Sequence, residues 1–577
     1  MKRVVFTLGL LLCGVVSLSA QTDYSKMIEV TREYTPTVER AQKLSIAPTA
    51  VDTVALRPES RYQITPTPWS TPFSVGKLDH AQLSAARWRN PGLGYLQIGG
   101  GYPLSSEADI YLTPLRSRST TLGFYLNHEG FEDKIKNDMG VRADALSLEN
   151  SAGVWLDSKL SERVDLQADA YYSLDLFTPY GGMSALDEEM NWGGRVRYND
   201  MGLSLSIGND FKDLAGLNYR FGGSFNLFTA TDVDTRKYAQ RDYSVWGRVG
   251  YSGEGHTVGL VVRAEGRKGL KELAGYDDFR LMMSPSYEFV TESNFMMRFG
   301  VDFIYNSSAE GDKKYLLPMV DIAYKRFYGF IPYLKVDGDL SDGSYRAQRL
   351  LNPYVAGGSW VNNGARLGGR IGANGDILGA VNYDIFGGYD VYRLYNYFVA
   401  VDSSSRFKAI ARPLNVAYYG ANLSVHLGSS WALRGGVKVN NTIPKESESE
   451  SLAALYAGVG VRKVEGDVAL QYQYKNKWNV ALGVRLLGEA QSVVNVGGVK
   501  SNADSGADGP IVAPMEDNYV NITLPSATDL YLNVEYRPKE KFAVYLSGAN
   551  LLGQKIYDFA YYPLPGVNVK AGVKVNF

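Results

Sequence analysis

The 577-residue chain carries a formal net charge of −1 and contains 61 glycines, 41 tyrosines and one cysteine. The balanced charge gives no basic surface for nucleic acid, and a single cysteine cannot form a disulfide within the chain. After Ala20, no stretch approaches the roughly 20 consecutive apolar residues that a membrane-spanning helix needs, which excludes helical membrane spans.

Residues 1–20 have the three parts of a secretory signal peptide. A basic pair follows Met1, the segment Val4–Val16 is largely apolar, and small residues predict cleavage after Ala20. The apolar part is too short to cross a bilayer as a helix. The only cysteine is removed with this segment, so we expect the exported chain to have neither disulfides nor thiol chemistry.

Residues 21–92 differ in composition from the rest of the chain. They are polar, show no sustained periodicity, and contain prolines at positions 36, 48, 58, 66, 68 and 72. Such a composition is typical of an extended segment. We therefore expect an N-terminal arm on the periplasmic or lumenal side of the domain that follows.

Residues 93–577 alternate strand-like runs with turns. Trp431–Asn440, Val480–Leu486 and Leu530–Arg537 each place apolar side chains on one face and polar or charged ones on the other. No motif recurs at a fixed period, which disfavours a repeat solenoid. The pattern predicts an all-β fold, a transmembrane antiparallel β-barrel of the outer membrane, because each strand has one face for lipid and one for water.

The connections between these runs fall into two classes. Short turns are expected at Asn199–Asp200, Gly375–Asp376 and Lys475–Lys477, among other places, and long polar loops at 340–363 and 495–518. Such a difference is typical of the periplasmic and outer rims of a barrel. With both termini periplasmic the strand number is even, and we count about 22 strands, within a range of roughly 16 to 22.

Two places leave the strand number open. Residues 93–118 are either barrel strands or part of the arm, and 202–230 is either one long strand or a broken pair. Glycine pairs inside strand-like runs, such as Gly222–Gly223, are expected where the wall bends or where another backbone comes close.

The clearest predicted strand is the last one. Apolar side chains occupy every second position from Val567 to Phe577, with asparagine and lysine among the residues between them. One face of this strand is therefore apolar and the other polar, as the closing strand of an outer-membrane barrel requires. Val573, Val575 and the terminal Phe577 resemble the strand that the barrel assembly machinery recognises, and they are the candidate assembly signal.

The segment around this strand resembles the end of TonB-dependent receptor barrels. In Leu546–Tyr557 an apolar strand leads into an Asn-Leu pair and a Lys-x-Tyr step, and Tyr562–Gly566 ends in a Pro-Gly turn. The specific resemblance covers about residues 530–577, and the rest matches that family in pattern and composition. It implies uptake across the outer membrane. The chain departs from the family because the arm is too short for a plug domain and has no plug-like motif.

The same resemblance suggests a partner for the arm. Met27, Ile28, Glu29, Val30 and Thr31 resemble the short segment by which TonB-dependent receptors add a strand to TonB. Strand addition needs only an exposed, extended run with alternating side chains. The alternative is a leader that contains this run by chance, and the partner could also be another periplasmic or outer-membrane protein.

A dense group of tyrosines has two interpretations. Tyr383, Tyr389, Tyr392, Tyr395 and Tyr397 are either part of the aromatic girdle at the membrane surface or a stacking platform for a sugar or peptide at the outer mouth.

No catalytic or metal site is predicted. The histidines at positions 80, 128, 256 and 426 lack metal-ligand spacing, no Gly-x-Ser-x-Gly motif is present, and nothing singles out a Ser–His or Asp–His pair. The loop 502–517 is rich in oxygen ligands but lacks the ordered alternation of a calcium loop. We therefore expect neither a cofactor nor enzymatic activity.

Two functions follow from these expectations. The first is transport, by a receptor-like barrel that takes up a nutrient and contacts an energising protein. The second is structural, as a scaffold or accessory subunit of an outer-membrane complex that is tethered by the arm. In both cases the protein lies in the outer membrane against its lipid. Loops, the arm or a partner must fill the lumen, because an empty barrel of this width would be a wide hole.

Overall fold

The computed structural model describes residues 92–136, 142–181, 194–209, 216–291, 294–327, 329–400, 406–443, 455–456, 458–495 and 519–577. The expected signal peptide, the arm with Met27–Thr31, and the loop 502–517 lie outside the described residues. Among the described residues, no helix combines the length and the apolar composition needed to cross a membrane.

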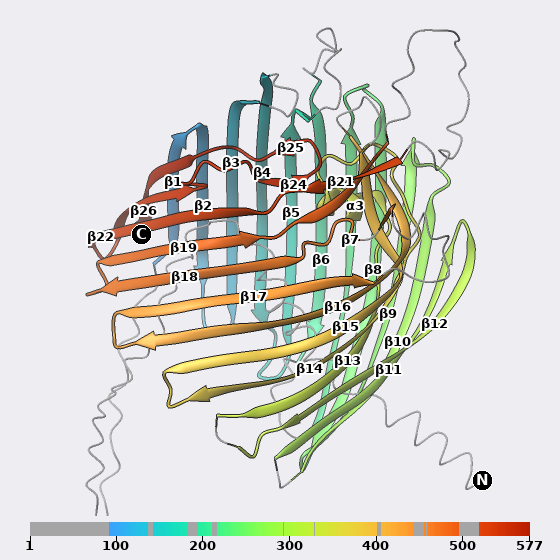
Figure 1. The fold of residues 1–577 in the computed structure, drawn as a ribbon. Helices are drawn as coiled ribbons and strands as arrows, with labels where there is room; N and C mark the ends of the chain where they lie inside the picture. The colour runs from blue at the N-terminus through green and yellow to red at the C-terminus, as the bar shows by residue number, and fades with distance from the viewer. Residues whose placement is uncertain are drawn as a thin grey trace, which may run out of the picture.

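Most of the described residues lie in one antiparallel wall of strands (Figure 1). The wall strands are β1 (Gly94–Tyr102), β2 (Leu104–Arg116), β3 (Thr120–Lys136), β4 (Arg142–Lys159), β5 (Asp165–Phe177), β6 (Val196–Gly208), β7 (Gly216–Thr231), β8 (Lys237–Gly253), β9 (His256–Lys271), β10 (Asp277–Val290), β11 (Phe295–Ser308), β12 (Gly311–Tyr324), β13 (Ile331–Leu340), β14 (Ala365–Ile377), β15 (Val381–Ala400), β16 (Phe407–Leu427), β17 (Trp431–Ile443), β18 (Val464–Tyr474), β19 (Trp478–Leu487), β22 (Ala527–Lys539), β23 (Phe542–Ala549) and β26 (Asn568–Asn576). The connections contain α3 (Tyr345–Leu351), β20 (Ala490–Asn495), β21 (Tyr519–Leu524), β24 (Tyr557–Phe559) and β25 (Tyr562–Pro563).

The wall closes on itself as a barrel of 22 strands, which confirms the predicted fold and number. Each wall strand pairs with its neighbours in chain order, and β26 pairs with β1, where Val575 lies opposite Leu96. The carbonyl oxygen of Phe577 accepts hydrogen bonds from the backbone N–H groups of Leu93 and Gly94, at 2.5 and 3.0 Å. The last residue of the chain therefore completes the closure.

Both places that left the strand number open contribute two strands each. Residues 94–116 form β1 and β2, which are part of the wall. The region 202–230 belongs to the separate strands β6 and β7, whose paired residues run from Arg197 opposite Thr231 to Gly208 opposite Arg220.

The two rims of the barrel differ in the length of their connections. We call the rim at which β1 begins and β26 ends the short-turn rim; the turns Glu254–Gly255 and Lys475–Lys477 belong to it. The other is the long-loop rim, which carries α3 in the connection 341–364, the β20–β21 hairpin, and the connection 550–567. This arrangement is the one that the loop lengths predicted.

The closing strand has the predicted apolar and polar faces. Val573 is 38% exposed on the outer face. On the lumenal face, the Lys570 ammonium lies 2.6 Å from a Glu129 carboxylate oxygen, and the Lys574 ammonium lies 2.9 Å from Glu535. Charged side chains are thus paired inside the barrel, and aliphatic ones face outwards where lipid is expected.

Two predicted turns are wrong. Asn199–Asp200 lies inside β6, where Val196, Tyr198 and Asp200 point inwards and Met201 is 43% exposed on the outer face. The polar Asp200 fits this strand because its carboxylate pairs with Arg346 in the lumen. Gly375–Asp376 lies within the last three residues of β14, and the turn itself follows at 378–380.

Several glycines of the wall lie beneath aromatic rings. Gly222 is opposite Trp246 and Gly266 is opposite Tyr243 in the strand register. A Cβ would lie 2.6 Å from the Trp246 ring at Gly222 and 2.1 Å from the Tyr243 ring at Gly266. Glycine at these positions therefore leaves room for an aromatic ring. It also permits the wall to bend.

Candidate functional site

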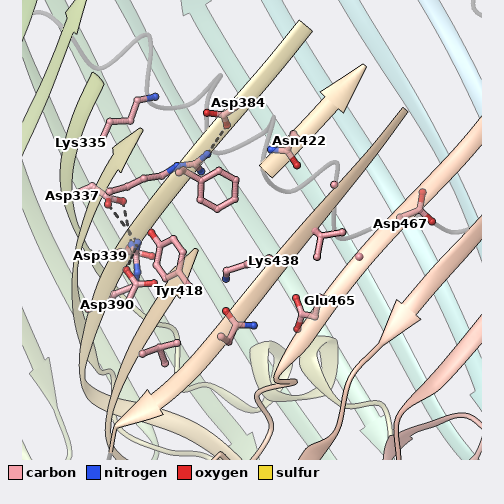
Figure 2. A pocket seen from close by; sticks show the side chains of 18 of the residues that line it. Lys335, Asp337, Asp339, Asp384, Asp390, Tyr418, Asn422, Lys438, Glu465 and Asp467 are labelled. Atoms are coloured by element: carbon pink, nitrogen blue, oxygen red, sulfur yellow. Dashed lines mark hydrogen bonds and ion pairs between the residues drawn. The ribbon is translucent and has the colours of Figure 1, made fainter. Parts of the chain in front are cut away.

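The lumen contains a cavity of about 1920 Å³ along the inner faces of β8 to β19 and β22 (Figure 2). Its lining alternates basic and acidic side chains with aromatic rings, including Trp246, Tyr333, Phe386 and Tyr418. The charges of the two signs are nearly balanced. The cavity is therefore suited to water and to polar solutes, and it has no strong preference for one sign of charge.

One side of the cavity is a ladder of charged pairs between neighbouring strands. Arg366 on β14 donates to Asp337 on β13 at 3.1 Å and to Asp390 on β15 at 3.0 Å. Four residues further along β14, Arg370 donates to Asp384 at 2.6 Å. The Arg370 guanidinium lies 3.7 Å from the centre of the Phe386 ring. These contacts hold the side chains in fixed positions along the wall.

The lining continues with further polar contacts on β16 to β19 and β22. The Lys438 ammonium lies 4.6 Å from the centre of the Tyr418 ring, and the Tyr531 hydroxyl donates to Asp467 at 3.0 Å. Figure 2 shows Lys438, Glu465 and Asp467 around the same space as Asp337 and Asp390.

The long-loop rim is closed by folded connections. We define the cap as residues 178–181, 341–364, β20 with β21, and 550–566. Its apolar core joins inward-facing residues of β3 and β4 to the ends of β15 and β16, on another side of the barrel. The core contains Ile135, Ala143, Ala145, Tyr180, Ala400, Phe407, Ala490, Val494, Leu524, Tyr557, Ala560 and Tyr562. The cap therefore spans the mouth of the barrel.

Aromatic rings form the centre of the cap. Tyr354 stacks on Tyr562 with ring centres 3.7 Å apart and an interplanar angle of 24°. Phe177 and Tyr180 meet the Tyr354 ring edge-on, at 5.6 and 6.0 Å. The Tyr180 hydroxyl donates to the backbone carbonyl of Pro563 at 3.0 Å. Three connections that are distant in the sequence are thus packed into one unit.

The helix α3 is attached to the inner wall by its arginines. Ser344 is the N-cap residue before the helix, and its hydroxyl accepts a hydrogen bond from Ala347 N–H at 3.4 Å. The Arg346 guanidinium lies 2.7 Å from Asp200 on β6 and 3.6 Å from Asp242 on β8. Arg349 pairs with Asp175 on β5. Burial works to lower the pKa of Arg346, but the hydrogen bond to Asp200 and the charge of that carboxylate raise it above its ordinary value, so this arginine stays charged.

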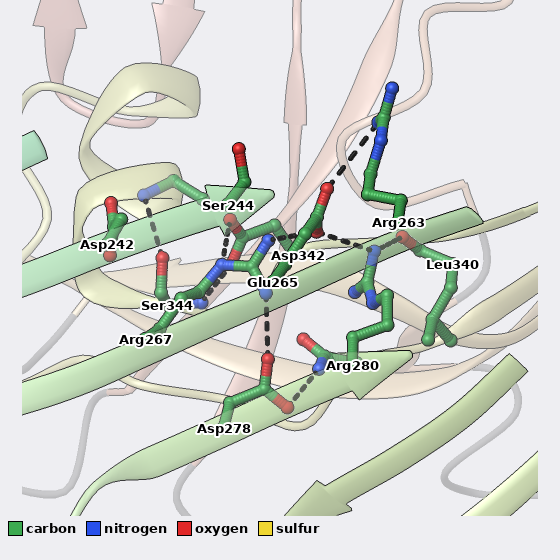
Figure 3. Close-up of polar contacts among 12 residues, drawn as sticks. Asp242, Ser244, Arg263, Glu265, Arg267, Asp278, Arg280, Leu340, Asp342 and Ser344 are labelled. Carbon is green, nitrogen blue, oxygen red and sulfur yellow. Dashed lines mark hydrogen bonds and ion pairs between the residues drawn. The ribbon is translucent and has the colours of Figure 1, made fainter. Parts of the chain in front are cut away.

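The residues before α3 are held by a second group of charges, shown in Figure 3. Arg267 on β9 contacts both Asp342 and Asp278, each at 2.8 Å. Arg280 on β10 donates to the backbone carbonyls of Leu340 and Ser341, each at 3.0 Å. All of these guanidinium groups are largely buried, so their contacts are shielded from salt and water.

Arg406 connects the cap to the connection between β7 and β8. It donates to the backbone carbonyls of Tyr354 and Val355 and pairs with Asp232. Asp232 also accepts from the backbone N–H of Gly357 at 2.9 Å. Burial works to lower the pKa of Arg406, but the neighbouring tyrosine hydroxyls and Asp232 raise it above its ordinary value.

The predicted tyrosine group is not one platform. Tyr383 lies near the short-turn rim and donates to the Gly329 carbonyl at 2.8 Å, and Tyr389 is 41% exposed on the outer face. Tyr392 and Tyr395 both line the cavity and contact each other edge-on at 5.1 Å. Tyr397 is buried in a core beside Tyr395. Any stacking role of this group therefore concerns Tyr392 and Tyr395.

The remaining candidate residues are placed as follows. Val573 and Phe577 are 38% and 42% exposed on the outer face at the seam of the barrel. Their role in assembly stays a prediction. Among the described residues, no group of three or more histidine, cysteine, aspartate or glutamate side chains could hold a metal ion.

The arginines that attach the cap were missed in the sequence. Arg346, Arg349 and Arg406 have no motif around them, and their partners lie 146, 174 and 174 residues away. The one available signal was an acidic residue at a lumen-facing position near the end of a strand-like run, as at Asp175 in β5.

Solved structures with this fold include receptors of the outer membrane. The FrpB iron transporter from Neisseria meningitidis aligns with a TM-score of 0.64 at 10% identity, over 85% of this chain and 83% of that one. The siderophore receptor PirA from Acinetobacter baumannii gives 0.63 at 10%, over 84% and 80%. The ferripyoverdine receptor of Pseudomonas aeruginosa gives 0.58 at 11%, over 84% and 71%.

These neighbours are an iron transporter, a siderophore receptor and a ferripyoverdine receptor. The chain resembles the TonB-dependent receptor barrel in fold, as its C-terminal segment predicted. At such low identity the likeness concerns the fold alone. No protein-family model and no curated protein matches the sequence.

Proposed function

Starting from the barrel fold that this chain shares with TonB-dependent receptors, we propose that it is a transport barrel for uptake across the outer membrane. The observation that carries the proposal is the polar cavity beneath a folded cap. A lumen lined with paired charges and rings gives a polar solute a path of hydrogen-bonding groups, and the cap keeps that path closed at rest.

The cap is suited to be a gate because its central segment is attached to the wall mainly by side-chain contacts. Its backbone also pairs with the first residue of β16: Ala356 N–H donates to the Phe407 carbonyl at 2.7 Å, and Phe407 N–H donates to the Tyr354 carbonyl at 3.0 Å. Arg346, Arg349 and Arg406 hold it from the inside, and each could exchange its carboxylate for water or solute. Opening would expose the stacked rings of Tyr354 and Tyr562 to the entering solute.

The test is the conductance of the purified full chain in a planar bilayer, with and without the central cap segment. The backbone N–H of Val361 donates to the Gly343 carbonyl at 2.9 Å, so the ends of 344–360 are adjacent and a short glycine linker can replace that segment. We expect low conductance for the wild type and a large increase for the shortened protein. A matched control shortens the exposed connection 160–163, which lies on the short-turn rim and is not part of the cap, so conductance should stay low.

A second candidate is the structural role, as a scaffold or accessory barrel of an outer-membrane complex. The apolar core of the cap is continuous with residues of the wall, as expected if the cap closes the mouth permanently. This continuity favours the structural role. The two functions differ in one measurement. A transport barrel should show solute-dependent openings of the wild-type protein, whereas a scaffold should stay closed with every solute and lose complex formation when residues 21–92 are removed.

A further inference from the structure

Three polar side chains meet on the outer face of β2, β3 and β4. The Oγ atom of Ser106 lies 2.8 Å from Nε2 of His128, and Nδ1 of His128 lies 2.8 Å from Oδ1 of Asn150. Asn150 is directly opposite His128 in the register of β3 and β4. Ser106 lies on β2 next to Ala108, the residue opposite His128.

This group interrupts an apolar surface. The neighbours on the same outer face include Phe124 and Leu126, which are 42% and 45% exposed, and Leu104, which is 68% exposed. Placing hydroxyl, imidazole and amide groups against hydrocarbon is costly, and ionisable residues at such positions usually serve a function. If these polar groups served only to satisfy one another's hydrogen bonds, the order in which they are connected would not matter.

That order defines the protonation of the histidine. The Asn150 amide nitrogen is directed to the Leu174 carbonyl at 3.5 Å, which leaves Oδ1 to face His128. An amide oxygen only accepts, so Nδ1 of His128 carries the hydrogen, and Nε2 is free to accept the hydrogen bond from the Ser106 hydroxyl. Nucleophile, base and orienting group follow one another as in serine hydrolases.

The surroundings leave the serine accessible. Its cross-strand neighbours are both glycine: Gly100 on β1 and Gly130 on β3. A Cβ at Gly130 would lie 2.5 Å from Oγ of Ser106 and 3.3 Å from Nε2 of His128. Ser106 itself belongs to the exposed residues of β2. A substrate can therefore approach the hydroxyl from the outer face.

We propose that Ser106, His128 and Asn150 form an esterase site that hydrolyses acyl esters of membrane lipids. The substrate class follows from the position of the site. A strand crosses the hydrocarbon in about 9–11 residues. On β3 the outward residues Leu122, Phe124 and Leu126 lie between the short-turn rim and His128. The site is thus near the hydrocarbon boundary on the long-loop side, at the depth of the ester bonds that join acyl chains to a lipid head group.

The reaction needs only water as co-reactant. Oγ of Ser106 bonds to the acyl carbon while Nε2 of His128 takes its proton. The bond from the acyl carbon to the leaving oxygen then breaks, and that oxygen receives the proton from Nε2. A water molecule attacks the acyl-serine with the same histidine as base, which releases the fatty acid and restores the serine hydroxyl. The histidine ring keeps its orientation through the bond to Asn150.

The experiment uses the purified full chain in detergent and in vesicles of phosphatidylethanolamine and phosphatidylglycerol. A fluorophosphonate reagent reports a reactive serine, mass spectrometry maps the labelled residue, and released fatty acid reports turnover. The variants are Ser106→Ala, His128→Ala, Asn150→Ala and Asn150→Asp. The control is Ser158→Ala, which removes an outward serine on β4 whose partner is the Thr120 hydroxyl and not a histidine.

We expect the reagent on Ser106 in the wild type and in Ser158→Ala. Fatty-acid release should vanish in Ser106→Ala and fall about 10²- to 10⁴-fold in His128→Ala, the range for loss of a general base. Asn150→Asp should retain more activity than Asn150→Ala, because a carboxylate also accepts from Nδ1–H. Labelling of Ser106 in the wild-type protein tests the proposal even if a variant fails to fold. A wild-type protein with neither labelled Ser106 nor released fatty acid, or equal release by Ser106→Ala, would overturn the proposal.

Discussion

At the scale of single residues, Arg406 shows how a buried guanidinium stabilises the cap. Its charge is paired with Asp232, and its other N–H groups bind the backbone carbonyls of Tyr354 and Val355. Arg406→Gln leaves Asp232 with an uncompensated buried charge, so we expect a loss of about 3–5 kcal/mol. Protease cleavage within 341–364 and the fluorescence of Trp360 would measure the loosening of the cap.

The matched control for that change lies in the same region. Arg236 pairs with Asp234 at 3.0 Å, but the two side chains are 65% and 50% exposed. Arg236→Gln should cost less than about 1 kcal/mol, because an exposed ion pair is screened by water. Equal protease sensitivity of the two variants would contradict the importance of Arg406.

A second residue-scale prediction concerns pH. Packing within the cap raises the pKa of Tyr354 to about 12, chiefly because burial disfavours the phenolate. An unfolded tyrosine ionises near pH ~10, so the stabilisation is complete below that pH and is lost as the pH rises towards 12. The cap should therefore become protease-sensitive between about pH 10 and 12. Tyr354→Phe should move this transition to higher pH, whereas Tyr102→Phe, at a residue 75% exposed, should leave it unchanged.

The last residue offers a third prediction. Phe577→Ala keeps the backbone hydrogen bonds to Leu93 and Gly94 and removes only the ring. If the assembly machinery recognises the terminal aromatic residue, the variant should insert less well while its export across the inner membrane is unchanged. Phe124→Ala removes another outward ring with the same 42% exposure and is the control. Equal amounts of both variants in the membrane would argue against recognition of Phe577.

At the scale of elements, the proposed coupling strand is the segment Met27–Thr31. Strand addition uses the backbone, so Ile28→Pro or Val30→Pro should abolish coupling, since proline removes a donor and restricts the backbone. Glu29→Ala removes only a side chain and should have little effect. Substrate-dependent growth and pull-down of periplasmic partners measure the outcome. Proline variants that match the wild type in both would exclude this role for the segment.

The arrangement of the strands also explains why the sequence alone did not reveal the group of Ser106, His128 and Asn150. Each pair of hydrogen-bonded partners is separated by 22 residues, because one strand with its connection returns the chain to the same height on the next strand. A search for close spacing cannot detect such a group. Pairing of β2 with β3 and of β3 with β4 brings it together.

At the scale of the whole molecule, the closed barrel predicts a simple physical behaviour. Among the described residues, each wall strand pairs with a neighbour on both sides, with β26 on β1, so the folded wall should resist detergent until it is heated. We expect the full-length protein in the outer-membrane fraction, with different gel mobilities before and after boiling. Identical mobilities, or mature protein that is soluble in the periplasm, would contradict a membrane barrel.

The sequence by itself determined the wall of this protein. Alternation of apolar and polar residues is a local property, since neighbouring side chains of a strand point to opposite faces, and the run from Val567 to Phe577 therefore predicts its own two faces. Loop lengths predicted which rim carries the long connections. The strand number followed from the same local pattern, apart from the two regions in which strand ends were ambiguous.

Only the tertiary structure decided what closes the mouth and which polar residues meet. Tyr180 binds the carbonyl of Pro563 across 383 residues, and Arg406 meets Asp232 across 174. The predicted turn at Asn199–Asp200 failed for the same reason, since Asp200 faces the lumen, where it pairs with the distant Arg346. Such contacts depend on the closure of the barrel, which brings distant strands to one lumen, and no local pattern encodes that proximity.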